Sequence, residues 1–386
     1  MSEILIERVV PGGDGLGRVD GEVCFVPYAL PGDHLSITAP KRRGGVLRAT
    51  ISNVIVPSPA RIAAACQVFG TCGGCTWLHF AYPAQAEAKR ALVADCFRRI
   101  ARCEVQPGWV EDASLRFGYR TRATFRAAKG RSGFLAARSH DIVDIAECPL
   151  CHPRLNEALA TLRKSGFEGE FEITVNPEGS ETLVWVNDRV DEVSRLFPLT
   201  NSSRDGVARH QFIFDGVPIV CGAFAQSSLL LNRMLVRAAQ AAIGDGETLL
   251  DLYCGNGNFS LGLAASRSVK GIDHNRAAIA AAQAIRPGVY EAGDEGAFVR
   301  AIGSAAWDAI LIDPPREGAK AIMPALAGNR TRRIVYVSCD PATLARDAKV
   351  LFDAEWDLVS LDAVDMFPQT FHVECVAAFV RRPGTH

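Results

Sequence analysis

The stretch DLYCGNGNFS, residues 251–260, decides the fold of the C-terminal half of this chain. The apolar run Thr248–Tyr253 leads into it and indicates a buried strand, after which Gly255 and Gly257 let the backbone approach a ligand closely. A helix predicted over 258–267 would present its N-terminus to the same ligand, where an anionic group is favoured. The stretch therefore predicts a strand, a cofactor-binding turn and a helix.

The alternation of strand, loop and helix continues from this stretch to the end of the chain. It implies a mainly parallel, doubly wound α/β sheet, in which ligands bind at the carboxyl ends of the strands. The further strands are expected over Val269–Asp273, Asp308–Asp313, Ile334–Ser338 and Val373–Val380, and the further helices around 275–284, 319–327 and 341–353.

The residues after the glycine turn indicate which cofactor the turn binds. A dinucleotide fingerprint needs a third glycine three positions after Gly257, and Ser260 stands there instead. Asp273 ends the next strand, where an acid can accept the ribose hydroxyls, and Asp294 closes the following unit, on the adenine side. A cofactor without a pyrophosphate but with a carboxylate, such as S-adenosylmethionine, fits these residues better than a dinucleotide.

A proline-stiffened loop at the end of another strand narrows the range of methylation reactions that the sequence allows. Enzymes that methylate exocyclic amines use a related loop, in which an aromatic residue follows Asp-Pro-Pro. Here Asp313 opens the loop and Arg316 stands where that aromatic residue would be. This argues against amine methylation and leaves Arg316 free to bind a phosphate or a base.

Cys339 and Glu374 are the candidate nucleophile and base. Cys339 lies at a strand end before a helix whose N-terminus would stabilise a thiolate. A thiolate that adds to C6 of uracil makes C5 nucleophilic enough to accept a methyl group, and a base must then remove the C5 proton. Glu374 stands among apolar residues, which raise a carboxyl pKa toward a useful value. Taken alone, Cys339 would more often be an inert buried thiol, and Glu374 an ordinary strand-end acid.

The N-terminal half carries the positive charge of the chain. Residues 1–140 contain 19 Lys and Arg against 11 Asp and Glu, whereas residues 141–386 contain 23 against 32. Short strands cut by Gly- and Pro-rich turns in residues 1–56 suit a small oligonucleotide-binding barrel, with Lys41, Arg42 and Arg43 on one of its loops. This half is therefore the favoured face for a polyanion, with uneven surface charge as the alternative.

A second basic stretch follows between Leu115 and His140, where there are seven basic residues and no acid. Backbone charge interleaved with aromatic rings is the general means of binding unpaired RNA, although a solvated β-face over core aromatics would give the same pattern. The residues chosen as RNA contacts here are Arg120, Arg122 and Arg126, and the interleaved rings are Phe117, Tyr119, Phe125 and Phe134.

Four of the twelve cysteines have metal-ligand spacing. Cys66, Cys72 and Cys75 lie close together, and Cys148 is the best fourth thiolate, with Cys151 as runner-up. Four thiolates suit either structural zinc or a [4Fe–4S] cluster, and the spacing alone leaves both open. A radical S-adenosylmethionine enzyme would need three cysteines spaced Cx3Cx2C, so we expect a structural clamp.

Four of these segments together resemble one family. SCDPATLARD, DPPREG, DLYCGNGNF and the terminal HVE are similar to the S-adenosylmethionine-dependent RNA 5-methyluridine methyltransferases, over nearly the whole chain. The resemblance implies that Cys339 is the nucleophile and Glu374 the base. Two residues depart from the family pattern. Asp340 stands where relatives usually have Asn, and Gln369 stands where many have His. The resemblance assigns the cofactor and active-site contacts to Gln226, Tyr253, Asn258, Asp273, Asp294 and Asp313.

The same resemblance implies how the chain is divided. Residues 1–57 would form a TRAM-like barrel, 58–215 a β-rich domain with a [4Fe–4S] cluster, and 216–386 a Rossmann-like class I methyltransferase domain. The substrate would be structured RNA, and 23S ribosomal RNA is favoured over tRNA. The target uridine would be flipped out of the RNA fold. We further expect a cytoplasmic monomer without a membrane partner. The rival from another class is a non-catalytic RNA-binding iron–sulfur protein.

Overall fold

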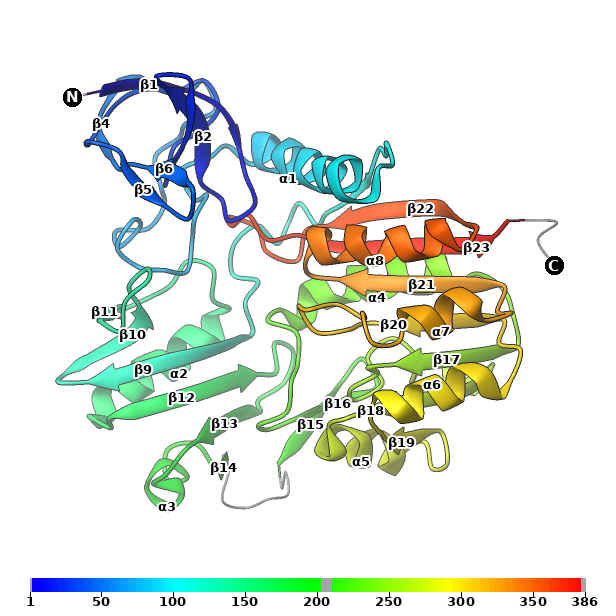
Figure 1. The fold of residues 1–386 in the computed structure, drawn as a ribbon. Helices are drawn as coiled ribbons and strands as arrows, with labels where there is room; N and C mark the ends of the chain where they lie inside the picture. The colour runs from blue at the N-terminus through cyan, green and yellow to red at the C-terminus, as the bar shows by residue number, and fades with distance from the viewer. Residues whose placement is uncertain (1, 203–209, 383–386) are drawn as a thin grey trace.

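Three units make up the chain, and the computed structural model describes residues 2–202 and 210–382. In Figure 1 a small β unit (blue) lies above a second, β-rich unit (cyan to green), and a larger α/β unit (green to red) lies beside them. In the part of the chain that the structure describes, no helix combines the length and apolar character needed to cross a membrane.

The N-terminal unit is a curled seven-stranded sheet in the order β5-β6-β3-β2-β1-β4-β7. Alternate residues of its strands point inward, so that Ile4, Cys24 and Leu35 share one buried core. Lys41, Arg42 and Arg43 were expected on a loop, and this is wrong: they form β5, because they pair antiparallel with β6. The strands are Ser2–Val9 (β1), Gly15–Val19 (β2), Glu22–Val26 (β3), His34–Ile37 (β4), Lys41–Arg43 (β5), Val46–Arg48 (β6) and Ile51–Val56 (β7).

The second unit is a six-stranded sheet in the order β11-β10-β9-β12-β13-β14, covered on one face by a helix. That helix begins at Pro153 and ends before Gly166, which adopts the left-handed conformation typical of a helix end. The elements are Arg122–Ala128 (β9), Arg131–Leu135 (β10), Ile142–Asp144 (β11), Pro153–Ser165 (α2), Gly169–Val175 (β12), Thr182–Val186 (β13), Val190–Val193 (α3) and Leu199–Ser202 (β14); the pair Gln211–Phe214 (β15) and Val217–Val220 (β16) follows.

The C-terminal unit is an eight-stranded sheet in the order β19-β18-β17-β20-β21-β23-β22-β8. Neighbours from β19 to β21 are parallel, as predicted, whereas β23 runs antiparallel to β21 and β22 antiparallel to β23. Its strands are Gly108–Val110 (β8), Thr248–Leu252 (β17), Ser268–Asp273 (β18), Tyr290–Ala292 (β19), Ala309–Ile312 (β20), Arg333–Ser338 (β21), Trp356–Val364 (β22) and Glu374–Arg381 (β23); its helices are Leu229–Ile243 (α4), Arg276–Ile285 (α5), Glu295–Ser304 (α6), Met323–Gly328 (α7) and Pro341–Asp353 (α8).

The prediction of a helix over 258–267 is wrong. This segment is a run of turns that ends in one short 3-10 helix, Leu263–Ala265. Gly255 and Gly257 have φ of 56° and 82°, outside the helical range. In the turns that follow, many backbone hydrogen bonds join residues i and i+3, instead of the continuous i to i+4 series of an α-helix. Turn N–H groups, rather than the end of a regular helix, therefore face the ligand here.

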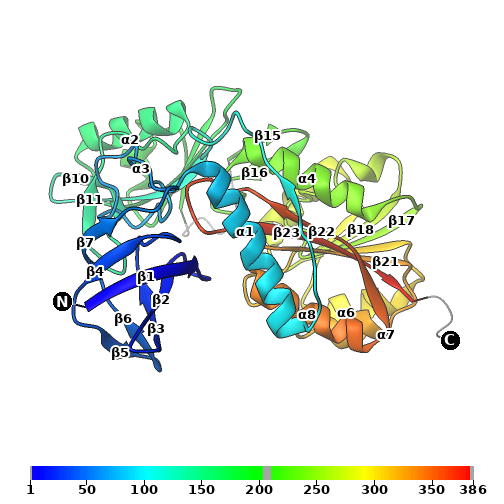
Figure 2. The same ribbon diagram turned by 90° about the horizontal axis from the view of Figure 1, so that it is seen from above.

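The segment after the N-terminal unit packs on the C-terminal sheet. The helix Tyr82–Cys96 (α1) continues into a π-helical turn, Phe97–Ala101, and Val93 and Phe97 are buried in the same core as Ile310. Strand β8 then joins the edge of that sheet, parallel to β22. Figure 2 shows α1 lying between the N-terminal unit and the sheet. Part of the range 58–215 is thus structurally continuous with the α/β unit.

The loop of residues 365–373, between β22 and β23, is where the units meet. The N-terminal unit reaches it through the β1–β2 turn, because Gly13 lies against Phe371 and the Gly13 carbonyl accepts a hydrogen bond from Trp77 Nε1 (3.0 Å). A Cβ atom at Gly13 would come within 2.9 Å of the Phe371 ring. This close approach leaves no room for a side chain at Gly13.

Gly13→Ala should therefore destabilise the protein more than Gly12→Ala. Both glycines have positive φ, 85° and 100°, so each alanine is strained by roughly 1 kcal/mol. Only Gly13→Ala also meets the Phe371 ring, which should add about 1–3 kcal/mol. Chemical denaturation of the two variants measures the difference, and equal stabilities would contradict this account of the contact.

Candidate active site

A cavity of about 1150 Å³ opens at the carboxyl ends of β17, β18, β20 and β21. This is the position expected for a ligand site in a doubly wound sheet. The cavity brings together most of the residues predicted from sequence, which come from segments far apart in the chain. The predicted residues that line it are Arg120, Arg122, Gln226, Tyr253, Gly255, Asn258, Asp273, Asp313, Cys339 and Glu374.

Asp273 fixes the glycine turn at one end of this cavity. One carboxylate oxygen of Asp273 accepts a hydrogen bond from the Gly255 amide (2.9 Å), and the other accepts one from the Asn275 amide (2.6 Å). Nearby, Asn258 exchanges two side-chain hydrogen bonds with Asn232 of α4 (2.7 and 3.2 Å). The turn is thus held rigid before any ligand arrives, as a pre-formed site requires.

The register of β21 and β23 sets Cys339 beside Glu374. The antiparallel pairing ends with Ser338 opposite Cys375, so Cys339, which follows Ser338, and Glu374, which precedes Cys375, lie at the same end of the two strands. They are near enough for Glu374 to raise the pKa of the Cys339 thiol. Cys339 exposes its side chain, whereas Glu374 is only 4% exposed, and both line the cavity.

The walls of the cavity suppress charge on these groups. Burial raises the pKa of the Glu374 carboxyl to about 7. It also raises the pKa of Asp313 well above its usual range, with the neighbouring Glu374 adding to the rise. Although Cys339 is open to the cavity, enclosure raises the pKa of its thiol to about 12. The negative charges of Glu374, Asp313 and Asp340 raise the pKa of this thiol further, whereas the positive charge of Arg316 lowers it.

Asp340, the departure noted beside the nucleophile, is the N-cap of α8. Its Oδ1 accepts hydrogen bonds from the Ala342 and Thr343 amides (2.9 and 3.1 Å), which satisfies two free donors of the helix. Its other oxygen lies 3.6 Å from Arg316 Nε. The charge of Asp340 is therefore partly offset by the helix end and by Arg316, although it still raises the pKa of Cys339.

Known proteins resemble the chain along nearly its full length. A family profile described as tRNA (Uracil-5-)-methyltransferase matches residues 207–286 and 299–382, and a TRAM domain profile matches residues 2–51. The Pseudomonas entomophila protein named 23S rRNA (uracil(1939)-C(5))-methyltransferase RlmD is 32% identical over 97% of this chain and 93% of its own length. A protein of the same name from Azoarcus sp. is 32% identical over 99% and 100%. The chain belongs to the S-adenosylmethionine-dependent RNA uracil-C5 methyltransferases.

A solved structure agrees with this membership. The crystal structure of Pyrococcus abyssi tRNA (uracil-54, C5)-methyltransferase, in complex with S-adenosyl-L-homocysteine, superposes with a TM-score of 0.76 at 27% identity, covering 98% of this chain and 99% of the other. The class I methyltransferase fold and the N-terminal TRAM domain predicted from sequence are thus confirmed.

Two predicted cofactor contacts of this uracil-C5 methyltransferase do not line the cavity. Asp294 is the N-cap of α6, and its Oδ1 accepts a hydrogen bond from the Ala297 amide (2.9 Å). Gly257 is part of the glycine turn, and a Cβ atom there would come within 2.9 Å of the Tyr290 hydroxyl. The packing of the turn against Tyr290 therefore leaves no room for a side chain at Gly257. Glu295, next to Asp294, lines the cavity instead.

Three residues that were not predicted from the sequence also line the cavity of this methyltransferase. Phe224 is 71% exposed at the cavity, two residues before Gln226, and His274 and Asn256 contribute to the wall. An exposed ring within the apolar run around Ala223 and Ala225 carries no distinguishing pattern. His274 directly follows Asp273 at the strand end, so position alone was the available signal.

The four predicted cysteine ligands of the methyltransferase lie around one small pocket. Cys66, Cys72, Cys75 and Cys148 all line it, whereas Cys151 does not and is only 2% exposed. Among the described residues, no group of three or more His, Cys, Asp or Glu has the arrangement that holds a single metal ion. Arg120 lines both this pocket and the large cavity.

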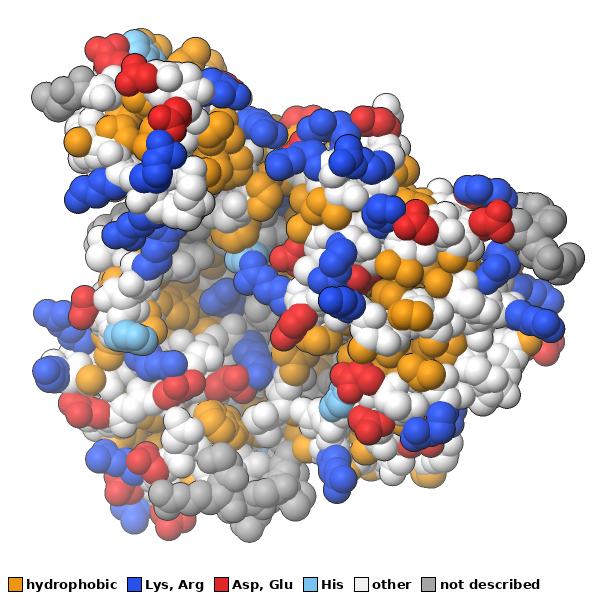
Figure 3. Space-filling model, in the orientation of Figure 1, with side chains coloured by type: hydrophobic (Ala, Val, Ile, Leu, Met, Phe, Trp, Pro, Cys, Tyr) orange, Lys and Arg blue, Asp and Glu red, His pale blue; other side chains and the backbone are white. Residues whose placement is uncertain are grey.

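Basic side chains lie on both sides of the hollow between the N-terminal half and the α/β unit, on the face drawn in Figure 3. Several of the predicted RNA contacts already have acidic partners. Arg122 pairs with Glu172 (2.7 Å) and Arg126 with Glu170 (2.8 Å), while Arg42 pairs with Glu22. These arginines therefore carry less free charge than their sequence pattern suggested.

The aromatic rings expected to interleave with those arginines divide into two groups. Tyr119 and Phe125 are fully buried, so for these two rings the stacking interpretation is wrong and the alternative of core aromatics holds. Phe117 is 43% exposed and remains open to a partner. The alternation along β9 explains the burial of Phe125, because the odd positions of this strand face α2 and the core. Tyr119 precedes β9 and is buried in the core of the α/β unit.

Glu374→Gln should change the stability of the methyltransferase in a pH-dependent way. The folded-state pKa of about 7 lies above the ordinary 4.5, so the stability associated with Glu374 is fully present below pH 4.5 and is lost as the pH rises through 7. The difference between these two pKa values corresponds to about 3 kcal/mol in the free energy of unfolding. Glutamine is neutral throughout, so the variant should gain on wild type by about that amount between pH 5 and pH 8 in urea unfolding.

The matched control is Glu317→Gln, which removes the same charge from an exposed position at the same cavity. Its stability relative to wild type should not change over this pH range by more than a few tenths of a kcal/mol. A flat difference for Glu374→Gln as well would contradict the burial of an uncharged Glu374 carboxyl.

Proposed function

We propose that this enzyme methylates C5 of a uridine in 23S ribosomal RNA, with Cys339 as the nucleophile and Glu374 as the base. The observation that carries the reaction is that these two residues line one cavity, at the same end of the paired strands β21 and β23. Cys339 adds through sulfur to C6, and C5 then accepts the methyl group that S-adenosylmethionine supplies. Glu374 removes the C5 proton, the C5–H electron pair restores the C5–C6 double bond, and the thiolate leaves.

The charges at the site bear on how Cys339 ionises. The thiolate is opposed by Glu374 and Asp313, and burial raises the pKa of both carboxyls. Arg316 favours the thiolate, and it belongs to the loop that begins at Asp313. Loss of a proton from Cys339 is therefore easiest when a neighbouring carboxyl has taken one up.

The donor would lie against the glycine turn. Asp273, at the end of β18, has the position from which an acid binds ribose hydroxyls, and Tyr253 and Asn258 lie beside the turn. Gln226 and Asp313 would contact the uracil or the transferred methyl group, since both line the cavity together with Cys339. Asp294 would act only through α6, whose N-terminus it caps.

The choice of 23S ribosomal RNA rests on relatives. The two relatives at 32% identity carry the name of a 23S ribosomal RNA methyltransferase and match over nearly their whole lengths. The alternative substrate is tRNA, after which the Pyrococcus abyssi enzyme is named. Lys41, Arg43, Arg120 and Phe117 are the exposed or cavity-lining groups that would contact either RNA.

We also propose that residues 1–57, 58–215 and 216–386 act as RNA-binding, cluster-bearing and methyl-transferring parts of a cytoplasmic monomer. Cys66, Cys72, Cys75 and Cys148 would hold a [4Fe–4S] cluster as a structural clamp. Their common pocket supports this, because Fe–S clusters are held by cysteine thiolates. Cys151 is the weaker candidate because it is buried away from the pocket lining.

The reaction and the substrate can be tested in one assay. Purified enzyme, labelled S-adenosylmethionine and separate 23S ribosomal RNA and tRNA transcripts should give 5-methyluridine in the ribosomal RNA. Cys339→Ala should lower the rate by at least about a thousandfold because no C6 adduct forms. Glu374→Gln should trap a covalent protein–RNA adduct on a denaturing gel.

Cys103→Ala, which removes a partly exposed thiol that does not line the cavity, is the matched control and should retain the wild-type rate. Full activity of Cys339→Ala would rule out the nucleophile. Methylation of tRNA but not of ribosomal RNA would favour the alternative substrate.

The cluster can be tested by analysis of protein purified without air. Wild type should be brown, with about four iron and four sulfide per chain, and Cys72→Ser should lose most of both. Cys151→Ser should keep them, since Cys151 lies outside the pocket lining. A colourless protein with stoichiometric zinc would show that the thiolates hold another metal.

A further inference from the structure

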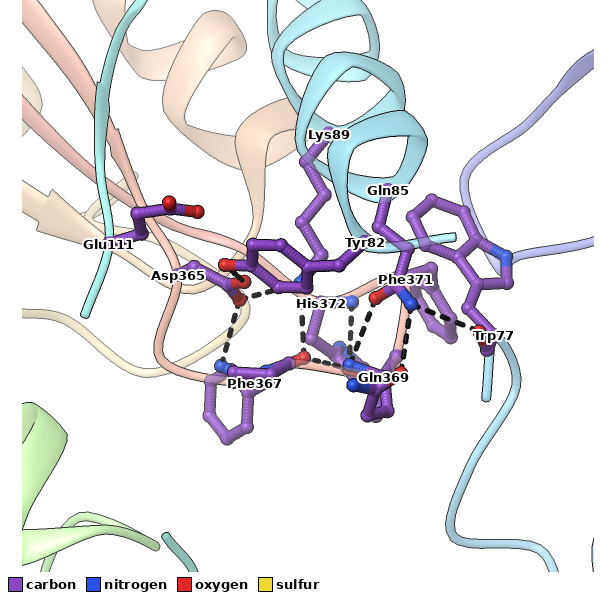
Figure 4. A network of polar contacts seen from close by, with 12 residues as sticks. Trp77, Tyr82, Gln85, Lys89, Glu111, Asp365, Phe367, Gln369, Phe371 and His372 are labelled. Carbon is purple, nitrogen blue, oxygen red and sulfur yellow. Dashed lines mark hydrogen bonds and ion pairs between the residues drawn. The ribbon is translucent and has the colours of Figure 1, made fainter. Parts of the chain in front are cut away.

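The loop of residues 365–373, which ends at Glu374, is held by buried charged groups (Figure 4). Lys89 of α1 donates through Nζ to Asp365 Oδ1 (2.6 Å) and to the Phe367 carbonyl oxygen (3.0 Å). Both charged side chains are enclosed, at 0% and 1% exposure. Tyr82 of the same helix donates its hydroxyl to the other oxygen of Asp365 (2.7 Å). The start of the loop is thus fixed to α1 without access to water.

A second set of hydrogen bonds fixes the middle of the loop. Gln85 Nε2 donates to Gln369 Oε1 (2.9 Å), and the backbone N–H of Gln369 donates back to Gln85 Oε1 (3.0 Å). The Gln369 carbonyl also accepts from the Trp77 amide (3.0 Å). Gln369 has φ of 71°, a left-handed conformation that side-chain-bearing residues rarely adopt and that its surroundings must impose.

Stability alone does not account for this arrangement. A buried ion pair is on average no more stabilising than an apolar pair of the same size, because both charges lose their water. What the pair adds is direction, since each hydrogen bond fixes one atom of the loop relative to α1. The loop carries Phe367 on the cavity wall and leads directly into Glu374.

We propose that Lys89, Asp365 and Gln85 are positioning residues for Glu374, which hold the loop 365–373 so that the carboxyl faces the cavity opposite Cys339. None of the three belongs to the cavity lining, so they act through the loop. Cys339 directly follows β21, which the loop does not carry. The inference rests on the proposed roles of Cys339 and Glu374, and it assigns α1 specifically to the proton-removal step.

The test is a double variant that removes both charges together, Lys89→Met with Asp365→Asn. Removing one partner would leave an uncompensated buried charge, whereas removing both is compatible with folding. Rapid quenching with RNA and labelled S-adenosylmethionine, followed by denaturing gels, separates adduct formation from adduct breakdown. Formation should stay within about twofold of wild type, while breakdown slows at least about tenfold, as expected for a displaced base. The covalent adduct should therefore accumulate.

The matched control is Lys349→Met with Asp353→Asn, which removes the same two residue types from a surface ion pair on α8 (2.8 Å, 48% and 66% exposed). Both of its rates should equal those of wild type. Wild-type breakdown in a folded Lys89→Met, Asp365→Asn protein would overturn the inference. Equal slowing of formation and breakdown would overturn it as well, because it would reveal only general structural support.

Tyr82→Phe decides the question if the double variant does not fold. It removes only the hydroxyl that donates to Asp365, and breakdown should slow about threefold with formation unchanged. Unchanged breakdown in Tyr82→Phe would then overturn the inference. The same gels separate this failure from failure of the proposed function. If Glu374→Gln traps no adduct, the mechanism itself is wrong; if it does and the α1 variants behave as wild type, only the positioning role is wrong.

Discussion

The antiparallel pairing of β23 with β21 is the constraint on which the active site depends. Every pair from β19 to β21 is parallel, so the carboxyl ends of those strands meet at one edge of the sheet. Because β23 runs the other way, its first residue, Glu374, arrives at that same edge. A parallel last strand would have placed the base at the opposite edge, far from Cys339. The reversal also brings the loop 365–373 to this edge, where α1 and the N-terminal unit can contact it.

A second constraint is the concentration of acids in a confined space. Asp313, Glu374 and Cys339 share one cavity wall, and enclosure raises the pKa of each. Such a group stores unfavourable electrostatic energy when it ionises, which is the usual condition of a site arranged for proton transfer. Asp340 fits this picture differently, because its carboxylate serves the first turn of α8.

Local patterns predicted the parts of the fold that local chemistry controls. The glycine turn, the strands around Thr248–Leu252 and Arg333–Ser338, and the meeting of Cys339 with the cofactor turn all follow from apolar runs that end in polar residues. The predicted 258–267 helix failed because the residues after the glycine turn close short turns instead of one continuous helix, and a helix-compatible sequence does not reveal that choice. The addition of β8 to the last sheet lay beyond local reasoning, since its partner β22 is more than two hundred residues further along the chain.

For the candidate site, the same limit applies to single side chains. Asp294 was expected at the cofactor, but an acid before a helix can equally cap it, and spacing does not separate these two uses. Phe125 was interpreted as a partner of an RNA, yet the two-residue period of a strand decides that its ring faces the core. Lys89 could not have been chosen at all, because nothing near it in sequence indicates a buried partner.

The position of that partner has a consequence for biosynthesis. Lys89 is separated from Asp365 by 276 residues, and β8 from β22 by a similar length of chain. While the protein is being translated, α1 emerges early with an ammonium group whose counter-ion has not yet been made. It must stay hydrated until Asp365 has been made. The active-site edge of the sheet therefore closes only after the loop 365–373 and β23 have been synthesised, so a shorter nascent chain lacks the complete catalytic pocket.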